Sequence, residues 1–250
     1  TEFLPISSSG HLVLVPSLFG WTDQGLVFDV TVHFGSLIAV CAYFRSDLVV
    51  MIRGALAVLS GKFDRPESRL ALALGVGTIP AGLAGLMFAG WIAANLRSPY
   101  VVIATLAGYA VLMGLADRFG ARERQMAGIT LKDVAVIGCA QALALIPGTS
   151  RSGATITAGL ALGFRREDAA RFSFLLSIPI ILLATMYEAW KLFSAPTALA
   201  VGDLALAVAV SATVAYLSIE FFMRFVNAIG LMPFVLYRLI LAAGIYYVLV

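Results

Sequence analysis

The chain has 250 residues, of which 61% are hydrophobic and only 12% are charged, and its mean hydropathy is +0.97. This composition excludes a soluble globular domain and indicates an integral membrane protein. The formal net charge is only +3 and the basic residues are spread over short loops, so no nucleic-acid partner is expected. Because the first residue is Thr1 rather than methionine, we expect the natural chain to begin earlier.

The first polar stretch is Pro5–His11, which reads Pro-Ile-Ser-Ser-Ser-Gly-His. After it come apolar segments, six of which approach or exceed the length needed to cross about 30 Å of hydrocarbon. We predict transmembrane helices at Leu26–Phe44, Leu70–Ala94, Tyr100–Ala116, Phe172–Trp190, Leu204–Met223 and Phe234–Val250. The segment Leu48–Leu59 is shorter, contains Arg53 and leads into a polar stretch, which predicts an interfacial helix.

A second polar stretch, Pro147–Thr155, separates the apolar runs Val134–Ile146 and Ile156–Phe164. Each run is too short to cross a bilayer alone. If residues 134–164 enter and leave on one side, nearly all loop arginines and lysines share one face, and only Arg97 and Lys191 lie opposite. A spanning segment would mix the charges more evenly, so the positive-inside rule favours a re-entrant hairpin.

The predicted order is therefore hairpin, three spans, hairpin, three spans, within a single membrane domain over residues 1–250. An odd number of crossings inverts the second unit, residues 134–250 with its hairpin at 134–164, relative to the first, residues 1–133 with its hairpin at 1–20. Pro5–Gly10 also resembles Pro147–Gly153, with one residue fewer. The predicted fold is all-α and polytopic: six transmembrane helices plus two re-entrant helical hairpins in an inverted-topology repeat, with the hairpin tips meeting near the membrane midplane.

The chemistry of the two tips favours an anionic ligand. An arginine at mid-bilayer costs about 2.5–3.5 kcal/mol, which suggests a binding site at Arg151 rather than a merely kinked helix with a snorkelling arginine. Small hydroxyl residues and glycines ahead of a helix leave N–H groups free for phosphate. The predicted phosphate-binding residues are Ser7, Ser9, Gly148, Ser152 and Gly153.

Phosphoryl transfer needs a positioned phosphate, charge neutralisation, a nucleophile and a proton acceptor. The candidate catalytic residues are Glu2, Ser8, His11, Ser150, Arg151 and Thr155. Arg151 would clamp the phosphate, and Ser8, His11 or water could be the nucleophile. Glu2 could bind a divalent cation or orient the attacking group.

These two stretches also carry a family resemblance. The sequence Thr1-Glu2-Phe3-Leu4-Pro5-Ile6-Ser7-Ser8-Ser9-Gly10-His11, together with Pro147-Gly148-Thr149-Ser150-Arg151-Ser152-Gly153-Ala154-Thr155, resembles the paired signature of the undecaprenyl pyrophosphate phosphatase family, the bacitracin-resistance phosphatases of bacteria. Phe28–Val30, His33–Ser36 and Ala170–Pro179 are also similar to the family's chain, and the order and spacing of the spans fit over essentially the whole sequence.

The resemblance implies an enzyme of the bacterial inner membrane that hydrolyses undecaprenyl diphosphate to the monophosphate and so recycles the lipid carrier of cell-wall synthesis. It implies a magnesium or calcium ion and an active site open toward the periplasm. It assigns functional positions to Glu2, Ser8 and His11 in the first motif, and to Ser150, Arg151 and Thr155 in the second. The family's further acidic or glutamine residue, four positions before Glu2, would precede Thr1.

The sequence also allows other functions, and it leaves the roles of three charged or titratable residues within the spans to be decided. A transporter or flippase for an anionic lipid or solute would use the same inverted-repeat site, and a homodimer is compatible with the sequence, which does not fix the oligomeric state. His33 and Asp29, four residues apart on one helix face, could lie beside the site or pair with each other, and we favour the structural pair. Arg238, alone within the last span, is expected to pair with a carboxylate such as Glu188 or to snorkel.

Overall fold

The computed structural model describes residues 1–20, 26–192 and 201–249, and in these ranges the chain is helical, with no strand beyond an isolated bridge between Arg124 and Phe164. The helices are α1 (Ser8–Phe19), α2 (Leu26–Tyr43), α3 (Arg45–Leu59), α4 (Pro66–Asn95), α5 (Pro99–Phe119), the short 3-10 helix η1 (Met126–Gly128), α6 (Leu131–Leu143), α7 (Arg151–Ala161), α8 (Arg166–Leu192), α9 (Val201–Ile229) and α10 (Met232–Leu249). The predicted all-α class is confirmed.

Five helices in the described ranges are long and apolar enough to cross a membrane: α4, α5, α8, α9 and α10. They confirm five of the six predicted spans. The remaining prediction, Leu26–Phe44, forms α2, whose 18 residues rise about 27 Å. The described part of α2, Val30–Tyr43, passes the same criteria only together with α3, from which it is bent by 91°. This right-angled turn is the geometry expected of the predicted interfacial helix.

The helices α6 and α7 form a hairpin, as predicted. They contain 13 and 11 residues, so neither could span a bilayer alone. Thr130 and Asp133 form a reciprocal capping box that starts α6, and the Ser150 hydroxyl caps α7.

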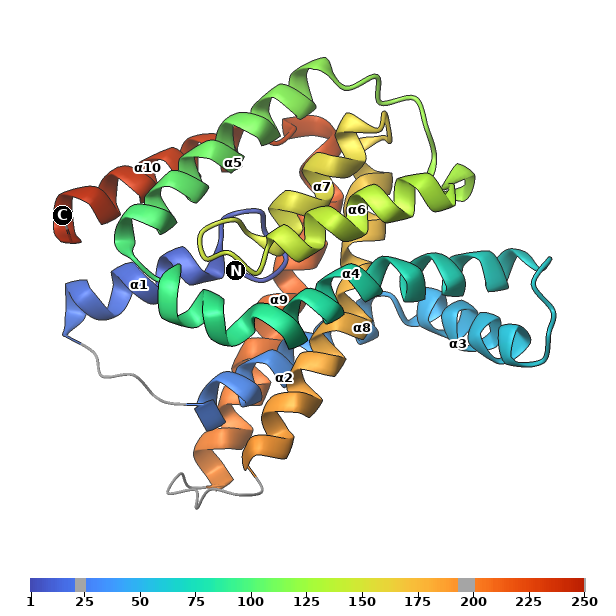
Figure 1. Ribbon diagram of the computed structural model, residues 1–250, viewed down its shortest axis with the longest axis horizontal. Helices are drawn as coiled ribbons and strands as arrows, with labels where there is room; N and C mark the ends of the chain where they lie inside the picture. Colours follow the sequence, from blue (N-terminus) through green and yellow to red (C-terminus); the bar gives the residue numbers. More distant parts are fainter. Residues whose placement is uncertain (21–25, 193–200, 250) are drawn as a thin grey trace.

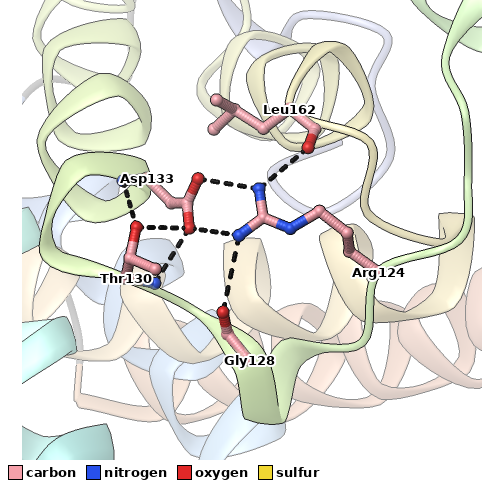
Figure 2. Close-up of polar contacts among 5 residues, drawn as sticks. All are labelled: Arg124, Gly128, Thr130, Asp133 and Leu162. Atoms are coloured by element: carbon pink, nitrogen blue, oxygen red, sulfur yellow. Dashed lines mark hydrogen bonds and ion pairs between the residues drawn. The ribbon is translucent and has the colours of Figure 1, made fainter.

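Arg124 holds the two open ends of this hairpin together (Figure 2). Its guanidinium donates to both carboxylate oxygens of Asp133, at 2.9 and 2.6 Å, and to the carbonyl of Leu162 at 2.9 Å. It also donates to the carbonyl of Gly128, while Thr130 donates to Asp133. We call these five residues the Arg124 clamp. Because the clamp joins the start of α6 to the end of α7, the hairpin enters and leaves at one end, as a re-entrant segment requires.

The tip of this hairpin lies next to the N-terminal turn near the centre of the molecule (Figure 1). Below it in the figure, α2 packs against α8 and α9, and above it α5 runs beside α10. An aromatic cluster fixes the N-terminal turn, since the buried Phe3 ring meets Phe174 edge-on at 5.5 Å and Phe174 lies 5.6 Å from Phe222. The first hairpin is described as this turn followed by α1, and the larger repeat of residues 1–133 and 134–250 stays a prediction.

Candidate phosphate site at the two turns

The turns that precede α1 and α7 share one local geometry. Ser7 and Ser150 both have a positive φ, 68° and 70°, and each stands directly before a helix. Each hydroxyl accepts from the backbone N–H three residues later, at 3.4 Å from Gly10 and 3.2 Å from Gly153. Both serines are therefore N-caps, and Ser8 and Arg151 occupy the same first position of their helices.

The predicted meeting of the two turns is confirmed. Hydrogen bonds cross between them from Gly148 N to the Ser9 hydroxyl (2.9 Å), from the Ser152 hydroxyl to the Leu4 carbonyl (3.1 Å) and from Arg151 Nη2 to the Glu2 carbonyl (3.2 Å). Five residues predicted to bind phosphate or to act in catalysis thus build the contact itself: Glu2, Ser9, Gly148, Arg151 and Ser152. Their hydroxyl and amide groups set the distance between the N-termini of α1 and α7.

Arg151 is held by backbone carbonyls and keeps unused donor capacity. Besides the Glu2 carbonyl, it donates from Nη1 to the carbonyl of Ser173 at 3.1 Å. Its Nε is buried and has no hydrogen-bond partner in the described structure. A buried N–H without a partner costs free energy unless a ligand satisfies it, and a guanidinium offers planar donors suited to a phosphate oxygen.

The loop between α6 and α7 requires glycine at residue 148. Its φ is +90°, and a Cβ there would lie 2.1 Å from Thr105 Oγ1 and 2.6 Å from the carbonyl of Val102. The Thr105 hydroxyl also donates to the carbonyl of Pro147 at 2.6 Å. The tip is therefore pressed against α5, and Gly148 shapes the site through its backbone.

The prediction that Arg238 pairs with a carboxylate or snorkels is wrong. The side chain is fully buried and donates to the carbonyls of Gly148 (2.9 Å) and Thr149 (3.0 Å), with longer bonds to Thr105 and Leu106 on α5. The side chain of Glu188, the suggested partner, lies outside the described residues. The sequence indicated no partner for the carbonyls that the broken helix leaves free. Arg238 is that partner.

A cavity of about 220 Å³ opens beside the turns, between α1, α2 and α9. Its polar wall contains Glu2, Ser8 and His33, and the Ser8 hydroxyl donates to the Glu2 carboxylate. The Arg151 guanidinium and the His33 imidazole both lie near the Glu2 carboxylate. The opposite wall includes the apolar side chains Phe28, Val32, Val214 and Ala215.

His33 lines this cavity, as the sequence analysis allowed, whereas its predicted pairing with Asp29 involves a side chain that lies outside the described residues and stays a prediction. The available signal was that His33 is one of only two histidines in the chain and lies in a stretch that resembles the family. A histidine four residues from an aspartate also predicts an intrahelical pair, so the sequence left both interpretations open.

The other histidine points elsewhere. His11 donates from Nδ1 to the carbonyl of Ser7 at 2.7 Å, and its Nε2 forms a hydrogen bond of 2.6 Å with the Tyr237 hydroxyl. The two rings also stack, with centroids 5.6 Å apart. The expected grouping of His11 with Glu2 and Ser8 on one face is therefore not seen, since His11 is not among the residues that line the cavity.

Thr155 lies beneath Arg151 and is 1% exposed. Its hydroxyl is 2.8 Å from the Arg151 carbonyl and 2.6 Å from the Ser173 hydroxyl. Because Ser173 also accepts from the Arg151 guanidinium through its carbonyl, Thr155 supports the segment that orients this arginine. Ser173 lies in the stretch Ala170–Pro179 that resembles the family, whereas Tyr237 carried no signal in the sequence beyond its place in an apolar run.

The side chains at the cavity limit the kind of metal ion that could bind there. No group of three or more His, Cys, Asp or Glu side chains that could hold a metal occurs in the described part of the chain. Glu2 is a single carboxylate in a cavity, with a hydroxyl beside it. Such a donor set fits a magnesium-type ion that is shared with the phosphates of a substrate, because these ions are held by one or two carboxylates, phosphates and water.

The chain is similar to known proteins over nearly its full length. Residues 1–244 match the family described as bacitracin resistance protein BacA. The chain is 50% identical to an undecaprenyl-diphosphatase of Hahella chejuensis, over 98% of this chain and 92% of that protein. It is 53% identical to one of Thioalkalivibrio sulfidiphilus, over 97% and 92% of the two chains, and 50% identical to one of Nitrosococcus oceani, over 99% and 93%.

Proposed function

This chain belongs to the family of bacitracin resistance protein BacA, and from that premise we propose that it hydrolyses undecaprenyl diphosphate to undecaprenyl phosphate and inorganic phosphate. The reaction would return the lipid carrier of cell-wall synthesis to use. The observation that carries the proposal is the buried, unpartnered Nε of Arg151, which lies beside the hydrogen-bonded Glu2 and Ser8. A phosphate needs such donors, and hydrolysis needs the nucleophile and base next to them.

Arg151 binds the terminal phosphate in this proposal. The helix N-termini of α1 and α7 direct N–H groups to the same region, which favours an anion. Ser7, Ser9, Gly148, Ser152 and Gly153 hold the two turns at the distance that the phosphate requires. Ser150 caps α7 and Thr155 supports the segment that carries Ser173, so both position Arg151.

Ser8 is the proposed nucleophile, because it lines the cavity and donates directly to Glu2, whereas His11 is occupied by Ser7 and Tyr237. The Ser8 oxygen attacks the terminal phosphorus and its proton passes to Glu2. The bond from that phosphorus to the bridging oxygen breaks, and undecaprenyl phosphate leaves. Water then releases inorganic phosphate from Ser8, which regains its proton.

Glu2 is also the ligand that this chain offers to a divalent cation, Mg²⁺ or Ca²⁺. The ion would neutralise negative charge on the diphosphate. His33 faces the same cavity and adds an imidazole near Glu2. The apolar wall from α2 and α9 would receive the first part of the polyprenyl tail.

We place the enzyme in the bacterial inner membrane, with its site open to the periplasm, and include a homodimer and the inverted repeat in the proposal. The shared geometry at Ser7 and Ser150 supports the repeat. In the predicted topology most loop arginines lie on one face of the membrane, and by the positive-inside rule this supports the proposed orientation of the site.

Phosphate release from undecaprenyl diphosphate in detergent, with Mg²⁺, with Ca²⁺ and with chelator, tests the proposal. Arg151→Ala and Ser8→Ala should each lower the rate by about 100-fold or more, while the exposed Arg97→Gln matches the loss of one charge and should leave it unchanged. Lipid binding by the same folded variants separates binding from chemistry. A folded wild-type protein that binds the lipid yet releases no phosphate under any metal condition would make the transporter or flippase reading the better one.

A further inference from the structure

We propose a second binding site, away from the two turns, that takes the headgroup of an anionic membrane phospholipid. It is a cavity of about 410 Å³ between the end of α3 and the loop that leads into α4. Three cations line it, Arg53, Lys62 and Arg65, against a single carboxylate, Glu67. No ion pair involves these three cations within the described part of the chain. The cavity is therefore positively charged and suited to phosphate.

The cavity is held in shape by close packing and hydrogen bonds. At Gly54 a Cβ would lie 2.0 Å from the carbonyl of Glu67, so α3 and α4 touch through their backbones. The buried Ser68 hydroxyl donates to the Lys62 carbonyl at 2.7 Å, and Lys62 N donates to the carbonyl of Ala57 at 2.9 Å. The loop that presents Lys62 and Arg65 is thus anchored at both ends.

The surroundings identify a lipid rather than a free anion as the occupant. The helix α3 leaves α2 at 91° and exposes a row of apolar side chains next to the cavity: Val49, Ile52, Leu56 and Leu59, with Phe63 in the following loop. A helix with this composition lies in the membrane interface with its apolar residues among the acyl chains. The three cations then lie at the depth of the lipid phosphates, where each basic residue adds to the attraction for anionic lipids.

The test is the thermal stability of the purified full-length protein in neutral detergent, titrated with short-chain phosphatidylglycerol, short-chain phosphatidylcholine or inorganic phosphate. Phosphatidylglycerol should raise the unfolding temperature in a saturable way, and phosphatidylcholine should not. In the triple variant Arg53→Gln, Lys62→Gln, Arg65→Gln the apparent Kd for phosphatidylglycerol should rise by at least about tenfold.

A control variant removes the same number of exposed charges elsewhere, through Arg118→Gln, Arg122→Gln and Lys132→Gln, and should keep the wild-type Kd. Glu67→Gln removes the only carboxylate of the cavity and should tighten binding several-fold, a gain that misfolding cannot imitate. The proposal is overturned if phosphatidylcholine acts equally, if both triple variants weaken binding alike, or if Glu67→Gln leaves it unchanged. Saturable stabilisation by inorganic phosphate through the same three cations would identify a free-anion site and overturn the lipid assignment.

Discussion

The Arg124 clamp gives the sharpest test of how the hairpin is held. Arg124 and Asp133 form a bidentate ion pair at the open end of α6 and α7 (Figure 2), and their side chains are 37% and 6% exposed. We expect Arg124→Gln and Asp133→Asn each to lower the free energy of unfolding. The quantity that isolates the pair is the coupling energy of a double-mutant cycle.

Two magnitudes bound this coupling energy. Exposed ion pairs contribute about 0.2–1 kcal/mol, and breaking a buried pair costs about 3–5 kcal/mol. The hydrogen bonds from Arg124, ahead of those from Thr130, lower the pKa of Asp133 from 3.8 to about 2. That shift corresponds to about 2–3 kcal/mol for all partners of the carboxylate together. Because Thr130 supplies part of it and Arg124 is partly exposed, we expect a coupling of about 1–2 kcal/mol.

Denaturant unfolding in detergent at pH 7, followed by circular dichroism, measures the wild type, both single variants and the double variant. Arg118→Gln is the matched control, because Arg118 is an exposed arginine over the ring of Phe119 with no ion pair in the described structure. It should change the free energy of unfolding by less than about 0.5 kcal/mol. If Asp133→Asn costs as much in the Arg124→Gln background as in the wild type, the pair does not hold the hairpin.

The remaining predictions concern pH and the two turns. The Asp133 contribution to stability should be fully present above pH 3.8 and lost as the pH falls through about 2, and this part of the slope of unfolding free energy against pH should vanish in Asp133→Asn. Gly148→Ala forces a Cβ into α5 at a φ of +90° and should abolish phosphate release, whereas Gly85→Ala, with open space around it, should retain the wild-type rate. Tyr237→Phe keeps the ring stacked on His11 but removes its hydrogen bond, and should lower the unfolding free energy by about 1 kcal/mol.

Hydrophobic run length and loop charge were enough to predict most of the helices. Runs such as Leu70–Ala94 and Leu204–Met223 lie within α4 and α9, because a membrane leaves a long apolar segment few alternatives to helix. The hairpin at 134–164 could be predicted because its two halves are too short to span and because the basic loop residues would otherwise be divided. Both arguments use quantities that the sequence contains.

The meeting of the two turns followed from their shared polarity and their place in the chain, but the orientation of individual side chains did not. Arg238 donates to carbonyls distant in the sequence, and His33 lines a cavity with Glu2 and Ser8, and no local pattern encodes either arrangement. His11 was grouped with Ser8 because the two residues are only three positions apart, yet its side chain contacts Tyr237 on α10. Spacing along one helix indicates which residues are neighbours, whereas packing against a second helix decides where their side chains point.

The manner in which the arginines are held suggests why one region of the protein can bind a diphosphate. At the periphery, Arg124, Arg166 and Arg171 are each paired with an aspartate, which cancels their charge. At the tip of the hairpin, Arg151 and Arg238 are held instead by backbone carbonyls.

A carbonyl dipole orients a guanidinium without neutralising it. Arg238 therefore keeps its positive charge, and Arg151, which also lies near the Glu2 carboxylate, forms no ion pair in the described structure. In a region of low dielectric both charges act strongly on an anion. The carbonyls of Gly148 and Thr149, which hold Arg238, are available because Pro147 and Gly148 interrupt the helix. The break in the helix and the retained positive charge are therefore two parts of one arrangement. Replacing the carbonyl contacts of Arg238 with a carboxylate partner would stabilise the arginine but weaken the site for phosphate.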